Sequence, residues 1–93
     1  TRFTLDIAAV PVIHKQSLYP VCIDVSHPAG QRDLVPALAK AAVAAGADSL
    51  MIEVHPNPPV ALSDGPQQLT PAQFRELVAE LRELAACLGK KIV

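Results

Sequence analysis

Three side chains with metal-binding chemistry lie in or just beyond two apolar segments of the chain. His27 follows the apolar run 21–25, Glu53 lies near the end of the run 50–55, and Asp64 belongs to the loop that comes next. One imidazole and two carboxylates form a donor set of intermediate hardness, which suits Mn²⁺, Fe²⁺, Co²⁺ or Zn²⁺ better than Ca²⁺. The structural alternative is an imidazole bonded to a backbone carbonyl, a carboxylate paired with an arginine, and an Asp-Gly turn.

Strand alternation gives a reason for Glu53 to point inward. Successive side chains of an extended strand face opposite sides, and the purely apolar side of 50–55 should pack against helices. The other side, with Met51, Glu53 and His55, would then face an interior. An ionised carboxylate is unfavourable there without a cation or a hydrogen-bonded partner. A metal bound by Glu53 together with His27 and Asp64 would supply the cation. His55 would lie beside these ligands and support one of them.

Five elements are expected, in the order helix, strand, helix, strand, helix. The first helix lies within residues 4–16 and begins either at a cap formed by Asp6 or at Pro11, and the pattern does not decide between these. The strands are the two apolar runs, whose β-branched residues are typical of strands covered on both faces, as in parallel sheets.

The second and third helices carry clearer end signals. Asp33 is predicted to cap the second helix and Gly46 to end it. Its predicted apolar face consists of Leu34, Leu38, Ala41, Ala42 and Ala45. In the third helix, Thr70 and Gln73 have the spacing of a capping box, and Gly89 marks the end. Its predicted buried stripe consists of Phe74, Leu77, Val78, Leu81, Leu84, Ala85 and Leu88.

This order predicts an α/β fold with a parallel sheet joined by a right-handed crossover. Two parallel strands alone seldom form a stable sheet, so further strands should come from the rest of a barrel or of a doubly wound sheet. In both architectures the chemistry collects at the carboxyl ends of the strands, where His27 and Glu53 are expected.

Composition excludes several classes of protein. The 93 residues have a net charge of −1 and only 3% aromatic residues, which argues against nucleic-acid binding. No apolar run is long enough to span a membrane, and the first residues lack a signal peptide's apolar core, so a cytoplasmic enzyme is expected. The chain also lacks a starting Met, which suggests that it was processed or belongs to a larger polypeptide. Its cysteines fit no zinc motif, and we expect free thiols, with Cys22 buried and Cys87 in the last helix.

Three segments resemble the 3-deoxy-D-arabino-heptulosonate 7-phosphate (DAHP) synthases of the smaller-subunit bacterial and archaeal type. Residues 24–35, DVSHPAGQRDLV, resemble the family's seventh strand and the loop after it. Residues 53–56, EVHP, with 61–69, ALSDGPQQL, resemble the eighth-strand segment. Residues 1–6, TRFTLD, resemble the stretch after the sixth strand.

The resemblance implies that the chain is the C-terminal portion, with the last two strands and their helices, of a single (β/α)8 TIM-barrel domain. The implied reaction condenses phosphoenolpyruvate with erythrose 4-phosphate to give DAHP and phosphate, at the start of the shikimate pathway. The implied metal ligands and catalytic residues are His27, Glu53 and Asp64. Arg2 and Ser26 are candidates for substrate contacts, against the simpler reading of a solvated arginine and a serine that closes a turn.

The resemblance also implies that the site is incomplete. The family's fourth metal ligand is a cysteine on an early strand, which Cys22 does not replace, and most phosphate-binding residues also lie on earlier strands. We therefore expect the isolated chain to be inactive, its partners being the rest of the barrel, in the same or another chain, and further copies in a homo-oligomer. Alternatives are a 3-deoxy-D-manno-octulosonate 8-phosphate synthase relative and a catalytically silent module for assembly or regulation.

Overall fold

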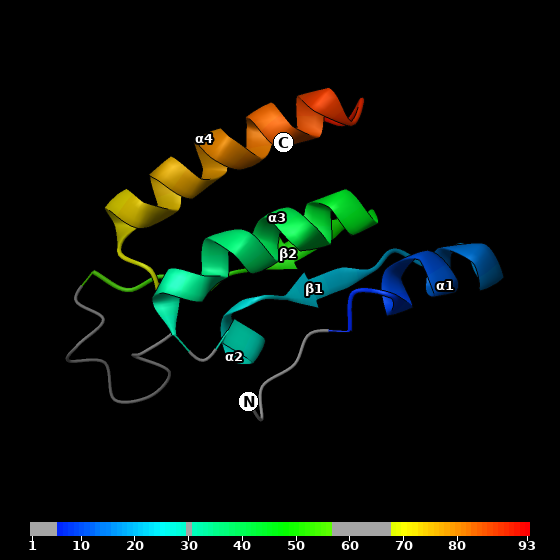
Figure 1. Cartoon of the computed structure of the whole chain (residues 1–93), viewed down its shortest axis with the longest axis horizontal. Coiled ribbons are helices and arrows are strands. Elements are labelled where there is room, and N and C mark those ends of the chain that lie inside the picture. The colour runs from blue at the N-terminus through cyan, green and yellow to red at the C-terminus, as the bar shows by residue number, and fades with distance from the viewer. Residues whose placement is uncertain (1–5, 30, 57–67) are drawn as a thin grey trace.

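The computed structural model describes residues 6–29, 31–56 and 68–93. Two parallel strands lie beside a layer of helices (Figure 1). In chain order the elements are α1 (Ala9–Gln16), β1 (Cys22–Asp24), α2 (Ser26–Ala29), the 3-10 turn η1 (Arg32–Leu34), α3 (Val35–Ala45), β2 (Ser49–Met51) and α4 (Pro71–Cys87). None of the helices in these three ranges combines the length and the apolar character needed to cross a bilayer.

The strands pair as the sequence predicts, in parallel, with α3 in the connection between them. The register places Cys22 opposite Ser49, Ile23 opposite Leu50 and Asp24 opposite Met51. The second strand is shorter than the expected run 50–55, because the chain beyond Met51 leaves β1. It pairs instead with the segment just before α4, through a parallel bridge between Val54 and Leu69.

The core lies between the sheet and the two long helices. Ile23, Leu50 and Ile52 pack against the core formed with α3 and α4, as strand alternation predicts for Leu50 and Ile52. Met51, on the other side of β2, is 52% exposed. Val54 was expected on the packed side but is exposed, since the chain has left the sheet by that point.

The last helix follows its sequence signals closely. The Gln73 N–H donates to the Thr70 hydroxyl at 3.1 Å, and the Gln73 side chain accepts from the Thr70 N–H at 2.9 Å, which confirms the capping box. Leu77, Leu81 and Ala85 are buried, whereas Leu88, predicted in the same stripe, is 44% exposed. The helix ends at Cys87, and Gly89 has a φ of 72°.

The start of α3 was predicted wrongly, and its packed face only in part correctly. Asp33 does not cap the helix: it lies inside η1, and the N-cap position is taken by Leu34 without a side-chain bond. The buried positions are Val35, Ala39, Ala42 and Val43. Of the predicted face, Ala42 is buried and Leu38 packs against the core, whereas Leu34 is exposed. The helix has small or apolar residues on nearly every side, so periodicity alone cannot select its packed face. Gly46 ends it with a φ of 103°, as expected.

Two further details differ from the sequence expectations. Helix α1 begins at Ala9 with Ala8 at the N-cap, so neither proposed start is right, and Pro11 lies in the first turn, where its missing N–H is tolerated. Cys22 is a free thiol, but it is exposed rather than buried. It alternates with Ile23, which packs into the core, and so lies on the side of the sheet away from α3 and α4.

Candidate metal-binding edge of the sheet

The carboxyl ends of β1 and β2 are joined by one buried serine. Ser26 is fully buried, and its Oγ accepts the backbone N–H of Glu53 at 2.8 Å. Its own N–H donates to Asp24 Oδ1 at 3.0 Å, which turns the chain from β1 into α2. Residue 27 therefore directly follows, in the chain, the residue whose side chain contacts Glu53. The sequence thus correctly predicts that the His27 and Glu53 segments meet, because parallel strands end at the same edge.

Glu53 is held at three points on the described part of the chain. Besides its N–H bond to Ser26, its carbonyl accepts the Leu69 N–H at 2.9 Å, and its Oε2 accepts from Gln68 Nε2 at 3.3 Å. The residue is half-buried. Sequence reasoning missed Gln68, since it lies 15 residues from Glu53 and no spacing rule connects the two.

His55 lies near the same edge and is half-buried. Its backbone N–H donates to the Leu69 carbonyl at 2.9 Å, so the segment 53–55 is tied by backbone bonds to the residue before the N-cap of α4. The role expected for its ring, support of a metal ligand, stays a prediction.

The other predicted site residues lie outside what the structure describes. Arg2 and Asp64 belong to residues that are not described, and for His27 only the backbone, within α2, is described. Within residues 6–29, 31–56 and 68–93, no group of three His, Cys, Asp or Glu side chains gathers in a way that could hold a metal. Since the predicted trio needs the His27 and Asp64 side chains, it stays a prediction.

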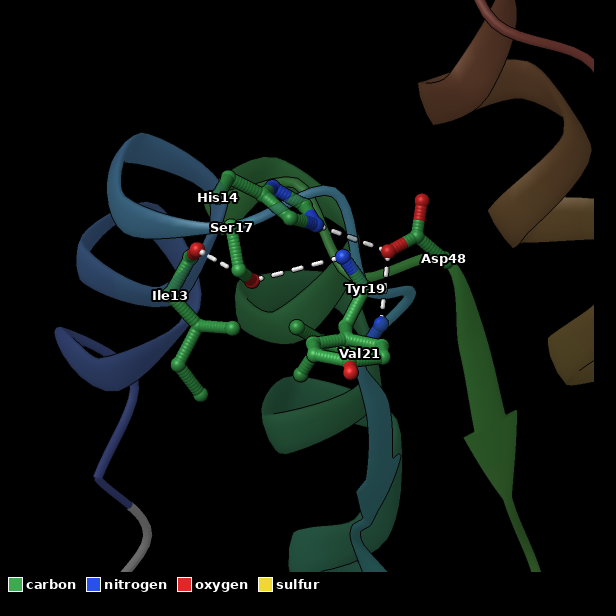
Figure 2. A network of polar contacts seen from close by, with 6 residues as sticks. All are labelled: Ile13, His14, Ser17, Tyr19, Val21 and Asp48. Carbon is green, nitrogen blue, oxygen red and sulfur yellow. Dashed lines mark hydrogen bonds and ion pairs between the residues drawn. The ribbon is translucent and has the colours of Figure 1, made fainter.

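A second polar network lies at the amino ends of the strands (Figure 2). Asp48 Oδ2 accepts the Val21 N–H at 2.7 Å and lies 2.7 Å from His14 Nε2, which donates to it. His14 is exposed, and its contact with Asp48 connects α1 to the turn before β2. The Val21 N–H, then the His14 ring, hold the pKa of Asp48 below its ordinary value of 3.8. Sequence reasoning missed this network, whose partners are far apart in the chain.

Beside the same network, Ser17 closes the end of α1. Its hydroxyl donates to the Ile13 carbonyl at 3.0 Å and accepts the Tyr19 N–H at 3.3 Å. These contacts turn the chain from α1 toward β1 (Figure 2). The amino ends of the strands therefore carry structural bonds, while the carboxyl ends carry the candidate chemistry.

Comparison with known proteins decides the family. The model of the DAHP synthetase I family matches residues 1–88. The chain belongs to this family. A phospho-2-dehydro-3-deoxyheptonate aldolase of Thermotoga maritima is 53% identical over 92 residues, covering 99% of this chain and 27% of the relative. A 2-dehydro-3-deoxyphosphooctonate aldolase of Desulfosudis oleivorans is 42% identical over 91 residues, covering 86% of this chain and 33% of the relative.

Solved structures agree with the sequence relatives. A truncated form of the Thermotoga maritima DAHP synthase superposes with a TM-score of 0.95 at 53% identity, covering all of this chain and 36% of that one. A crystal structure of DAHP synthase from the same organism gives a TM-score of 0.96 over 27% of its chain. This chain thus spans between about a quarter and a third of the length of these relatives.

Proposed function

We propose that the chain is the C-terminal portion of a (β/α)8 barrel domain that acts as a DAHP synthase. The reaction would condense phosphoenolpyruvate with erythrose 4-phosphate to give DAHP and phosphate. The observation that carries the proposal is the bond from the Glu53 N–H to Ser26, which brings two family motifs to one sheet edge. The 53% identity to the Thermotoga aldolase, against 42% to the octonate aldolase, favours DAHP as the product.

The proposed metal ligands are His27, Glu53 and Asp64, with Mn²⁺, Fe²⁺, Co²⁺ or Zn²⁺ as the ion. The donor set fits such an ion, and Glu53 is half-buried at a strand end, where a carboxylate gains from a cation. A bound metal would supply Lewis-acid polarisation of the aldehyde carbonyl. Arg2 would contact a substrate phosphate. Ser26 stays the second predicted substrate contact, which would require its fully buried hydroxyl, now accepting from the Glu53 N–H, to become accessible.

The rest of the barrel is the proposed partner, whether it lies in the same chain or another. Parallel strands are normally covered on both faces, whereas Met51 and Cys22 are exposed on the side of the sheet away from α3 and α4. In a closed barrel this side would face the interior, and the earlier strands would form the rest of the barrel wall. A cytoplasmic location and a homo-oligomeric state stay predictions from sequence.

A hybrid enzyme tests the proposal. In the hybrid, these 93 residues replace the segment that they match in the Thermotoga maritima aldolase. We expect DAHP formation that EDTA abolishes and added Mn²⁺ restores, and no activity from the 93 residues alone. A folded hybrid without chelator-sensitive DAHP formation would contradict the synthase proposal. Metal binding without any turnover would instead favour the silent module.

A further inference from the structure

Gln68 is placed beside Glu53 by the backbone. The Leu69 N–H donates to the Glu53 carbonyl and the Leu69 carbonyl accepts the His55 N–H, both at 2.9 Å. This pairing fixes the register between the two segments, so the residue before Leu69 lies next to Glu53. From there Gln68 Nε2 donates to Glu53 Oε2 at 3.3 Å.

The orientation of the Gln68 amide follows from the chemistry of its neighbour. An ionised carboxylate only accepts hydrogen bonds, so the amide nitrogen must face Glu53 and the amide oxygen must point elsewhere. That oxygen, Gln68 Oε1, is buried and has no hydrogen-bond partner in the described part of the chain. Buried acceptors are normally paired, so the amide is oriented for its contact with Glu53 at the expense of its own oxygen.

We propose that Gln68 is a positioning residue that orients the Glu53 carboxylate for the metal, and that its buried oxygen accepts a donor from another part of the completed barrel. The Ser26 hydroxyl fixes the Glu53 backbone, while Gln68 fixes one carboxylate oxygen, so the ligand is held at both ends. Side chains that hydrogen-bond to metal ligands set the orientation of those ligands. This inference rests on the proposed function, because it assigns Glu53 to a metal.

The test uses Gln68→Met in the hybrid enzyme, since methionine keeps the length and removes both polar ends of the amide. We expect Co²⁺ alone to bind about tenfold more weakly, which is the effect typical of losing a partner of a metal ligand. The visible absorption of the bound Co²⁺ should also change, because its bands report the ligand geometry. The melting temperature of the metal-free hybrid should also fall slightly, because the barrel donor that the proposal assigns to Gln68 Oε1 would lose its acceptor, so the Co²⁺ spectrum is the readout that reports ligand orientation.

Gln16→Met makes the same change at an exposed residue at the end of α1 and should leave both readouts unaltered. Gln68→Leu is a second variant that also lacks the donor, and it should weaken Co²⁺ binding similarly. Unchanged Co²⁺ affinity and spectrum in both variants would overturn the positioning role, as would a loss of affinity that leaves the Co²⁺ spectrum unchanged. If the unsubstituted hybrid folds but binds no Co²⁺, the proposed metal site itself fails and this inference fails with it. If the unsubstituted hybrid binds Co²⁺ and the Gln68 variants bind it in the same way, only this inference fails and the proposed metal site stands.

Discussion

At the residue scale, the proposed metal site depends on the imidazole of His27, which directly follows the buried Ser26. His27→Ala in the hybrid enzyme should abolish stoichiometric binding of Co²⁺, because it removes the nitrogen donor of the proposed trio. The bound metal can be counted by atomic absorption after gel filtration. His14→Ala, the same change at the amino ends of the strands, should keep the metal. Full occupancy in His27→Ala would refute the ligand assignment.

Ser26 itself offers a stability prediction. Ser26→Ala removes the acceptor of the Glu53 N–H at a fully buried position, and an unsatisfied buried donor costs about 1–3 kcal/mol. We expect the free energy of unfolding of the metal-free hybrid, from urea titrations, to fall by about that amount. Ser49→Ala, at an exposed position of β2, should change it by less than about 0.5 kcal/mol. Equal effects would argue against the bond as a link between the strand ends.

At the element scale, α4 has the best-defined start. Thr70→Ala should destabilise the hybrid by about 1 kcal/mol, because the Gln73 N–H loses its acceptor. The same urea titrations measure this, with Thr70→Ser as the control, since it keeps the hydroxyl. Equal stability of the alanine and serine variants would show that the capping box contributes little.

Structural features that neighbouring residues determine could be predicted from the sequence. The capping box of α4, the left-handed end of α3 at Gly46 and the alternation of Ile23, Leu50 and Ile52 into the core all follow from neighbouring residues. Asp33 shows the limit, since a cap depends on whether a 3-10 turn precedes the helix.

The candidate site likewise combines features that could be predicted from the sequence with features that could not. Parallel pairing predicts that the His27 and Glu53 segments meet, because strand order alone decides it. Two hydrogen bonds, from Gln68 to Glu53 and from the Val21 N–H to Asp48, depend on how distant segments pack. Residue spacing does not encode this packing. The burial expected for Cys22 would require the further strands of the proposed barrel.

The network around Asp48 predicts a pH dependence for the elements that it joins. Its folded-state pKa is lowered, chiefly by the Val21 N–H and then by His14, so its contribution to stability is present above its ordinary value of 3.8. That contribution is lost as the pH falls below 3.8 through the folded-state pKa. At pH 7 the urea midpoint of Asp48→Ala should therefore lie below that of the parent hybrid, and the two midpoints should converge as the pH falls below 3.8. Asp33→Ala, at an exposed residue of η1, should keep a constant offset from the parent.

At the scale of the whole molecule, the uncovered side of the sheet is where the chain should meet the rest of the barrel. Cys22 lies on that side and is exposed, and Cys87 is exposed at the end of α4, so both thiols of the isolated chain should react with iodoacetamide. In the hybrid, the earlier strands should close over the first thiol only.

We therefore expect the alkylation rate of Cys22 to fall by more than about tenfold between the isolated chain and the native hybrid, because a thiol enclosed in a packed interior is inert. Peptide mass spectrometry resolves the two cysteines, and Cys87 serves as the internal reference in each sample. Denaturing the hybrid in urea should restore the Cys22 rate. Fast alkylation of Cys22 in a native, active hybrid would mean that this side of the sheet does not face the barrel interior, and the parity argument that points Glu53 inward would fall with it.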